Sequence, residues 1–143
     1  MIVNTAYPYM GQAAPSTPKL WGEGKVYVPY ELIGDATFQP DTGTYGSRFV
    51  LPNSTSGVNL TINAKGYSKI SLSMNRQGSG GVQITFAYYK GSTLLGTVQQ
   101  RIDNYVTGYQ VAIPSEAQTK GVTLKITQPT SAVVNLWEAT MIA

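Results

Sequence analysis

The 143-residue sequence predicts an all-β fold, an antiparallel β-sandwich (jelly roll) with an extended N-terminal arm. Short segments alternate apolar and polar residues with a period of two, which is the period of strands that bury one face. Turn-forming residues separate these segments at intervals of about 8–12 residues, and helical periodicity is not found between them. We therefore expect about nine or ten short strands that close over one apolar core.

Residues 68–91 are predicted to form the central β-hairpin. Ile70, Leu72 and Met74 alternate with polar residues in its first arm. The second arm continues the alternation with Val82, Ile84, Phe86 and Tyr88. The glycine-rich residues 78–81 between the arms tolerate the backbone of a tight turn. Because an isolated hairpin is only marginally stable, we expect neighbouring strands to cover its apolar row.

Four shorter strands are predicted before this hairpin, at residues 25–30, around Phe38, at 48–51 and at 58–64. Pro29 removes a backbone donor, which places the first of them at a sheet edge or at a strand end.

Four more strands are predicted after the hairpin, at residues 93–101, 109–113, 122–127 and 132–142. Residues 114–121 fit one helical turn or a loop. Apolar residues fall on both faces of the last strand. We therefore expect one of its faces to meet the core and the other to meet another part of the protein, such as the arm.

Residues 1–24 are predicted to form the arm, and residues 25–143 the β-sandwich domain. Prolines and glycines in the arm prevent a helix and interrupt any strand ladder. The arm carries more apolar side chains than a disordered tail normally does. We expect it to dock on its own sandwich or on a neighbouring copy, which makes a homo-oligomer the expected assembly. Four side chains are the candidate assembly contacts, namely Tyr7, Tyr9, Met10 and Trp21.

The charge distribution disfavours two classes of partner. Ten Lys and Arg residues are spread singly along the chain and give a net charge of +3. Without a basic cluster to neutralise phosphates, nucleic acid is not an expected partner. No polybasic segment, amphipathic helix or long apolar run predicts a membrane partner. The N-terminus also lacks the basic and apolar regions of a secretory signal peptide, which predicts synthesis in the cytoplasm.

The residue types argue against catalysis. Cysteine and histidine are absent, which removes thiol nucleophiles, disulfides and the commonest general base. Ser16 and Lys19 have the spacing of a Ser-x-x-Lys pair, but Pro18 prevents the helical turn that would join them. The seven Asp and Glu residues leave open a spatial carboxylate pair of the kind glycosidases use. We predict that the protein is not an enzyme and has no catalytic residue.

No cofactor is expected either. A phosphate loop at residues 78–81 is disfavoured, because a strand rather than a helix follows them. Neither an Asp-x-Asp run nor an EF-hand loop is present. One metal site stays open, a structural Ca²⁺ held by loop carbonyls with Asp35, Asp41 or Glu138.

Aromatic residues are the candidate contacts to a glycan or a protein partner. Tyr45, Tyr67 and Tyr105 are predicted in or beside loops, and Trp137 lies in the last strand. Three interpretations remain open: aromatic rings at the rim of the core, a protein interface, and a saccharide contact.

Two stretches resemble known proteins. Residues 1–11, MIVNTAYPYMG, resemble the N-termini of small structural proteins in tailed phages of Gram-positive bacteria. Residues 66–114 contain GYSKISLSM, GVQITFAYY and GYQVAIP, and GVTLKIT follows at 121–127. This block is similar to the carbohydrate-binding-module-like jelly rolls that decorate phage tails, baseplates and capsid fibres.

The resemblance implies a non-enzymatic virion protein, made in the host cytoplasm and attached through its arm to other virion proteins. A host-surface polysaccharide is a further implied partner. Proteins of this kind often carry aromatic residues on the concave sheet or at loop tips, and Tyr45, Tyr67 and Tyr105 are the loop candidates for a glycan contact here. The alternative interpretation is a freestanding carbohydrate-binding module.

Overall fold

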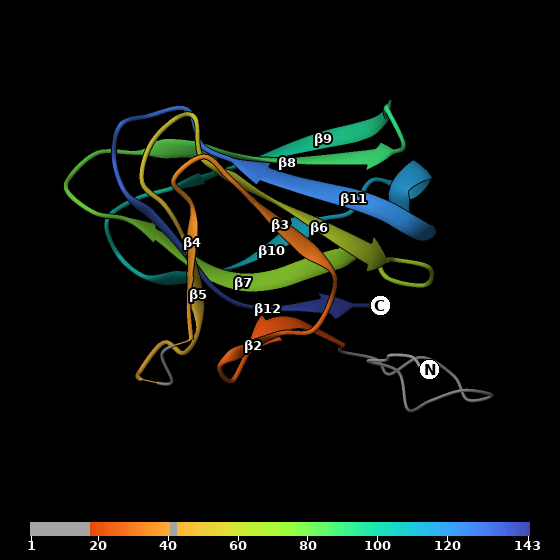
Figure 1. Ribbon diagram of the computed structural model, residues 1–143, viewed down its shortest axis with the longest axis horizontal. Helices are drawn as coiled ribbons and strands as arrows, with labels where there is room; N and C mark the ends of the chain where they lie inside the picture. Colours follow the sequence, from red (N-terminus) through yellow and green to blue (C-terminus); the bar gives the residue numbers. More distant parts are fainter. Residues whose placement is uncertain (1–17, 41–42) are drawn as a thin grey trace.

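The computed structural model describes residues 18–40 and 43–143 as two antiparallel β-sheets packed face to face (Figure 1). The all-β sandwich predicted from the sequence is confirmed, because the only helical element in the described residues is the short 3₁₀ turn η1 (Ser115–Ala117). Within the described chain, no helix has the length and apolarity that crossing a membrane requires.

The larger sheet has seven strands in the order β10-β7-β12-β1-β2, with β5 and β4 joined beside β12. The long strand β12 is shared on one side: its first half pairs with β5 and its second half with β1. The strands are β1 (Lys19–Gly22), β2 (Lys25–Val26), β4 (Thr37–Gln39), β5 (Arg48–Leu51), β7 (Lys69–Arg76), β10 (Thr107–Ala112) and β12 (Val134–Ile142).

The smaller sheet has five strands in the order β3-β6-β11-β8-β9. Its strands are β3 (Tyr30–Ile33), β6 (Gly57–Asn63), β8 (Val82–Lys90), β9 (Thr93–Ile102) and β11 (Lys120–Thr127). The apolar rows of both sheets meet in one core, whose largest fully buried side chains include Trp21, Phe49, Phe86 and Tyr88.

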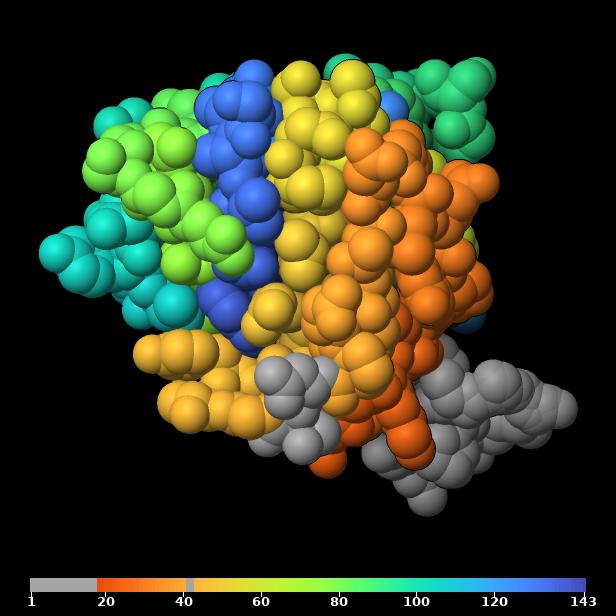
Figure 2. All heavy atoms as spheres, turned by 60° about the vertical axis from the view of Figure 1, so that its left-hand side comes forward, coloured from red at the N-terminus to blue at the C-terminus, as the bar shows by residue number. Residues whose placement is uncertain are grey.

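The predicted central hairpin is wrong, because β7 and β8 belong to different sheets. Residues 77–81 carry the chain from one sheet to the other, so the two apolar rows face each other across the core instead of lying side by side. Period-two alternation identifies the buried face of each strand but does not identify the strand beside it. The connecting loop lies at one end of the sandwich, next to the β9–β10 loop (Figures 1 and 2).

The sandwich begins earlier than the predicted boundary at residue 25. β1 pairs with β12, and Leu20 and Trp21 are completely buried in the core. The Trp21 Nε1–H donates to the backbone oxygen of Leu136 at 3.1 Å, which satisfies the indole inside an apolar core. Trp21 is therefore a core residue and not an assembly contact. The other three candidate contacts of the arm lie outside the described residues: Tyr7, Tyr9 and Met10.

A β-bulge explains why apolar residues occupy both parities of the last strand. The register of β12 against β7 shifts between Trp137 and Thr140, and Glu138 has a φ of 27°. The extra residue resets the alternation, so Ala139 and Met141 reach the core although Trp137 points the other way. The bulge therefore accounts for the apolar residues on both faces of β12 without a contact from the N-terminal arm.

The buried hydroxyl of Tyr88 is expected to lower the stability of the core. Its ring is fully buried, its hydroxyl has no hydrogen-bond partner within the described residues, and burial raises the pKa of its phenol. An unpartnered buried polar group costs about 1–3 kcal/mol. We therefore expect Tyr88→Phe to raise the free energy of unfolding by about 1 kcal/mol in urea denaturation. A loss of that size would instead show that the hydroxyl has a partner.

Candidate functional site

The outer face of the seven-stranded sheet carries an aromatic pair beside a guanidinium. Trp137 lies opposite Arg48 of β5 and Ser73 of β7, and its side chain is not part of the core cluster. The rings of Tyr45 and Trp137 lie 5.4 Å apart between centroids, at an interplanar angle of 55°. The Arg48 Cζ lies 5.7 Å from the centroid of the Trp137 ring. This is cation–π distance, so the three side chains support one another.

Backbone contacts hold the loop that presents Tyr45. The Gly46 N–H donates to the Gly43 oxygen at 3.0 Å, which closes a turn around Tyr45. The Glu138 N–H at the bulge donates to the Ser47 oxygen at 3.2 Å. The Ser47 hydroxyl in turn accepts the Gly24 N–H from the β1–β2 turn. The same bulge that turns Trp137 outward therefore also anchors the loop whose ring covers it.

The surface beside this aromatic pair is open. Ser73, which is opposite Trp137, pairs on its other side with Gly108 of β10. A Cβ placed on Gly108 would meet no atom within 4 Å. We call Tyr45, Arg48, Ser73, Gly108 and Trp137 the Trp137 site. It places the aromatic pair beside small polar residues. Within the described residues, Arg48 forms no ion pair and its Nε has no hydrogen-bond partner.

The predicted contact residues differ in what they can reach. Tyr45 is 53% exposed and Trp137 only 6%, so a ligand would touch the Tyr45 ring, with Trp137 behind it. Tyr67 is 5% exposed and packs in the core, so the predicted surface contact there is wrong. Its position at the crossover between β6 and β7 carries the ring between the sheets. Tyr105, at 73% exposure, lies in the separate β9–β10 loop.

Arg48, Ser73 and Gly108 are the members of this site that the sequence did not single out, and Arg48 is the charged one among them. It was predicted only as the first residue of a short strand. The signal that marks it is its cross-strand position opposite Trp137, which depends on the pairing of β5 with β12.

Two of the three carboxylates that the sequence offers as calcium ligands, Asp35 and Glu138, lie in the described part of the chain. The Asp35 carboxylate accepts a hydrogen bond from Asn53 Nδ2 at 3.1 Å. The Glu138 carboxylate accepts one from the Glu23 N–H at 3.3 Å. No group of three carboxylates that could hold a metal occurs among the described residues, and Asp41 lies outside them. The calcium site therefore stays a prediction.

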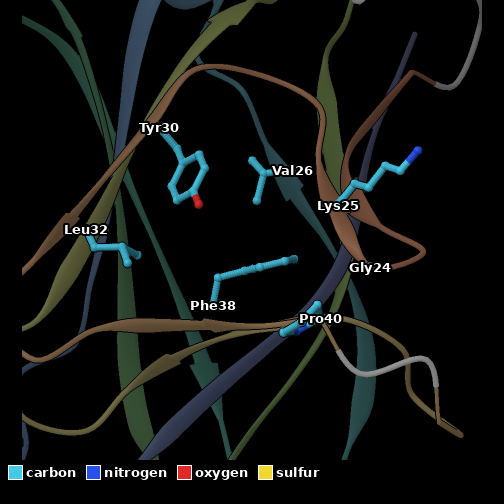
Figure 3. A pocket seen from close by; sticks show the side chains of 7 residues that line it. All are labelled: Gly24, Lys25, Val26, Tyr30, Leu32, Phe38 and Pro40. Atoms are coloured by element: carbon cyan, nitrogen blue, oxygen red, sulfur yellow. The ribbon is translucent and has the colours of Figure 1, made fainter.

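A hollow of about 490 Å³ lies at one edge of the sandwich, between β2, β3 and β4 (Figure 3). Two of its aromatic lining residues, Phe38 and Tyr30, pack on the buried Phe49 ring at centroid distances of 5.0 and 5.7 Å. The Tyr30 hydroxyl points into the hollow, whereas the Lys25 ammonium points away from it (Figure 3). Seven residues line it: Gly24, Lys25, Val26, Tyr30, Leu32, Phe38 and Pro40. This hollow offers apolar contact with few polar partners.

The fold can be compared with known proteins. No family model matches the chain, and a search of the curated proteins finds no match. Solved structures do resemble it. The family 11 carbohydrate-binding module of a cellulosomal cellulase from Clostridium thermocellum aligns with a TM-score of 0.58 and 7% identity, over 92% of this chain and 96% of that one.

Two further structures give the same result. A family 29 carbohydrate-binding module aligns with a TM-score of 0.58 and 10% identity, over 87% of this chain and 86% of that one. A Clostridium thermocellum xylanase with CBM22-1 and GH10 modules, complexed with xylohexaose, aligns at 0.57 and 12% identity over 87% of this chain. The present chain spans 28% of that longer chain.

These structures define the fold class as the jelly-roll sandwich of carbohydrate-binding modules, as the sequence predicts. At such low identities the likeness establishes the fold alone. None of the three is a virion protein, so the predicted phage origin gains no support from them.

Proposed function

We propose that the protein is a non-catalytic carbohydrate-binding module whose ligand lies on the Trp137 site. The observation that carries the proposal is the half-exposed Tyr45 ring, backed by Trp137 and Arg48 and bordered by the open floor at Ser73 and Gly108. The fold supports it, because the similar structures include carbohydrate-binding modules. The virion assembly that the two resemblances imply, and the predicted homo-oligomer, stay predictions.

The chemistry of the site suits a sugar ring. The C–H face of a pyranose stacks on the exposed Tyr45 ring, an apolar contact of the kind that aromatic side chains make well. The Arg48 guanidinium donates to sugar oxygens, and the Ser73 hydroxyl both donates and accepts. Trp137 acts as a positioning residue, because its nearly buried ring fixes the orientation of both Tyr45 and Arg48.

The outer face is a better candidate than the edge hollow. A saccharide carries a hydroxyl on most ring carbons, and each hydroxyl that loses water without a new partner weakens binding. At the edge hollow, Tyr30 supplies the hydroxyl that points inward, and apolar side chains supply most of the rest (Figure 3). The Trp137 site combines stacking surface with a guanidinium and a serine hydroxyl.

Calorimetric titration against cell-wall polysaccharides and simple glycans tests the proposal. We expect at least one saccharide to bind, and Tyr45→Ala to weaken its affinity about tenfold, which is about 1.4 kcal/mol. Tyr30→Ala is the matched control, because it removes an exposed tyrosine from the edge hollow and is expected to leave the affinity unchanged. Unfolding curves of both variants exclude loss of fold as the cause.

Two results would contradict this function. One is the absence of binding across the panel by the wild-type protein. The other is a saccharide that binds equally well to Tyr45→Ala, or that is lost in Tyr30→Ala, which would move the ligand to the edge hollow.

A further inference from the structure

Two arginines lie against neighbouring glycines of the loop that joins the two sheets. Arg76 at the end of β7 donates from Nη1 to the Ser79 oxygen at 2.6 Å. A Cβ on Gly80 would lie 2.8 Å from that same nitrogen, and a Cβ on Gly81 would lie 2.8 Å from Arg101 Nε. Consecutive Cα atoms are about 3.8 Å apart, so the two guanidinium groups lie over neighbouring residues.

The glycines are what permits this approach. Gly81 has no left-handed φ, so the backbone there accepts any residue, and the side chain of Arg101 fills the space that a Cβ would take. Because Gly81 has no side chain, the Arg101 guanidinium can lie directly against the backbone of the loop. A turn alone would not require glycine at this position.

No acidic side chain of the described residues forms an ion pair with either arginine. In the described ranges, neither Arg76 nor Arg101 forms an ion pair, and Arg76 Nε has no hydrogen-bond partner. Asp103 is the neighbouring acid, but its Oδ1 accepts the Tyr105 N–H at 2.8 Å and pairs with neither arginine. Two guanidinium groups that lie against neighbouring residues of one loop, neither of them in an ion pair, favour binding of an anion, and an arginine fork matches an oxyanion in shape.

The loop that carries an exposed aromatic side chain, Tyr105, is hydrogen-bonded to the end of β7. The Arg76 N–H donates to the Asp103 oxygen at 2.8 Å, and Asn75 Nδ2 donates to the Asn104 oxygen at 3.3 Å. These bonds fix the β9–β10 loop, which carries Tyr105, against the end of β7. Both loops protrude side by side at one end of the molecule (Figure 2). Tyr105 is the most exposed of the large apolar and aromatic side chains in the described residues.

We propose that Arg76, Gly80, Gly81, Arg101 and Tyr105 form a second binding site, the arginine site, for an acidic saccharide. The two guanidinium groups bind its carboxylate or sulfate group, and the Tyr105 ring stacks on the sugar that carries it. The site lies on other loops than Tyr45, and it does not depend on the Trp137 site being occupied.

The test is a titration of the full chain with trigalacturonate, with sulfated dextran oligosaccharides and with a neutral dextran of the same length. We expect an acidic oligosaccharide to bind, and Arg101→Gln and Arg76→Gln each to weaken it at least fivefold. Lys125→Gln, which removes the same charge from β11, is expected to change the affinity less than twofold. Equal loss in all three variants would overturn the site, because it would indicate nonspecific attraction to net charge.

A variant that keeps the charge makes the test sharper. Gly81→Ala retains both arginines but displaces the Arg101 guanidinium, and we expect it to weaken the acidic ligand about as much as Arg101→Gln. Tyr45→Ala is expected to leave this affinity unchanged, so failure at one site is distinguishable from failure at the other. Absence of acidic binding, or full affinity in Gly81→Ala and Arg101→Gln, would overturn the proposal.

Discussion

Trp21→Ala is expected to lower the free energy of unfolding by about 3–5 kcal/mol, the usual effect of removing a large aromatic side chain from a core. The Trp21 ring is fully buried and meets the Phe49 ring edge-on at a centroid distance of 4.9 Å. Its loss leaves a cavity between β1 and β5 and exposes the Leu136 carbonyl to an apolar space without its donor. Urea denaturation followed by tryptophan fluorescence of Trp137 measures the change.

Trp21→Phe separates the two parts of this effect. Phenylalanine fills much of the volume but has no N–H for the Leu136 oxygen, so we expect a loss of about 1–3 kcal/mol, smaller than for alanine. A loss below 1 kcal/mol in Trp21→Ala would mean that β1 is not part of the folded sandwich. The arm boundary at residue 25 would then be correct after all.

The sequence predicted the faces of the strands better than their neighbours. The buried row of β7, Ile70, Leu72 and Met74, was read correctly, because alternation depends only on residues within one strand. The assignment of β7 and β8 to one hairpin was wrong, because pairing depends on the path of the connecting loop through space. A five-residue glycine-rich loop can close a hairpin or cross between sheets, and the local pattern is the same for both.

In the candidate site, too, the local features could be predicted from the sequence and the contacts between distant residues could not. Tyr45 was placed correctly in a loop by the turn-forming residues around it. Its contact with Trp137 was not predictable, because it depends on the bulge at Glu138, which resets the face of the last strand. Tyr67 was misplaced for the opposite reason, since a residue beside a turn can still lie between two sheets.

Gly34→Ala is expected to lower the free energy of unfolding by about 3 kcal/mol, and Gly91→Ala by only about 1 kcal/mol. The two glycines have nearly the same left-handed backbone, with φ of 64° and 61°. Alanine therefore causes the same local backbone strain at either position. It also gives the same stabilisation by reducing the conformational entropy of the unfolded chain. What differs is the space that the new methyl group enters.

At Gly34 the methyl group would lie 2.6 Å from the backbone oxygen of Thr55, whereas at Gly91 it would meet nothing within 4 Å. The Thr55 backbone cannot move aside freely, because its N–H donates to Asn53 Oδ1 at 3.1 Å. The difference between the two variants in urea denaturation thus measures how firmly the β3–β4 turn packs against the β5–β6 loop. Equal losses in both would show that this packing is loose and that backbone strain alone explains the need for glycine.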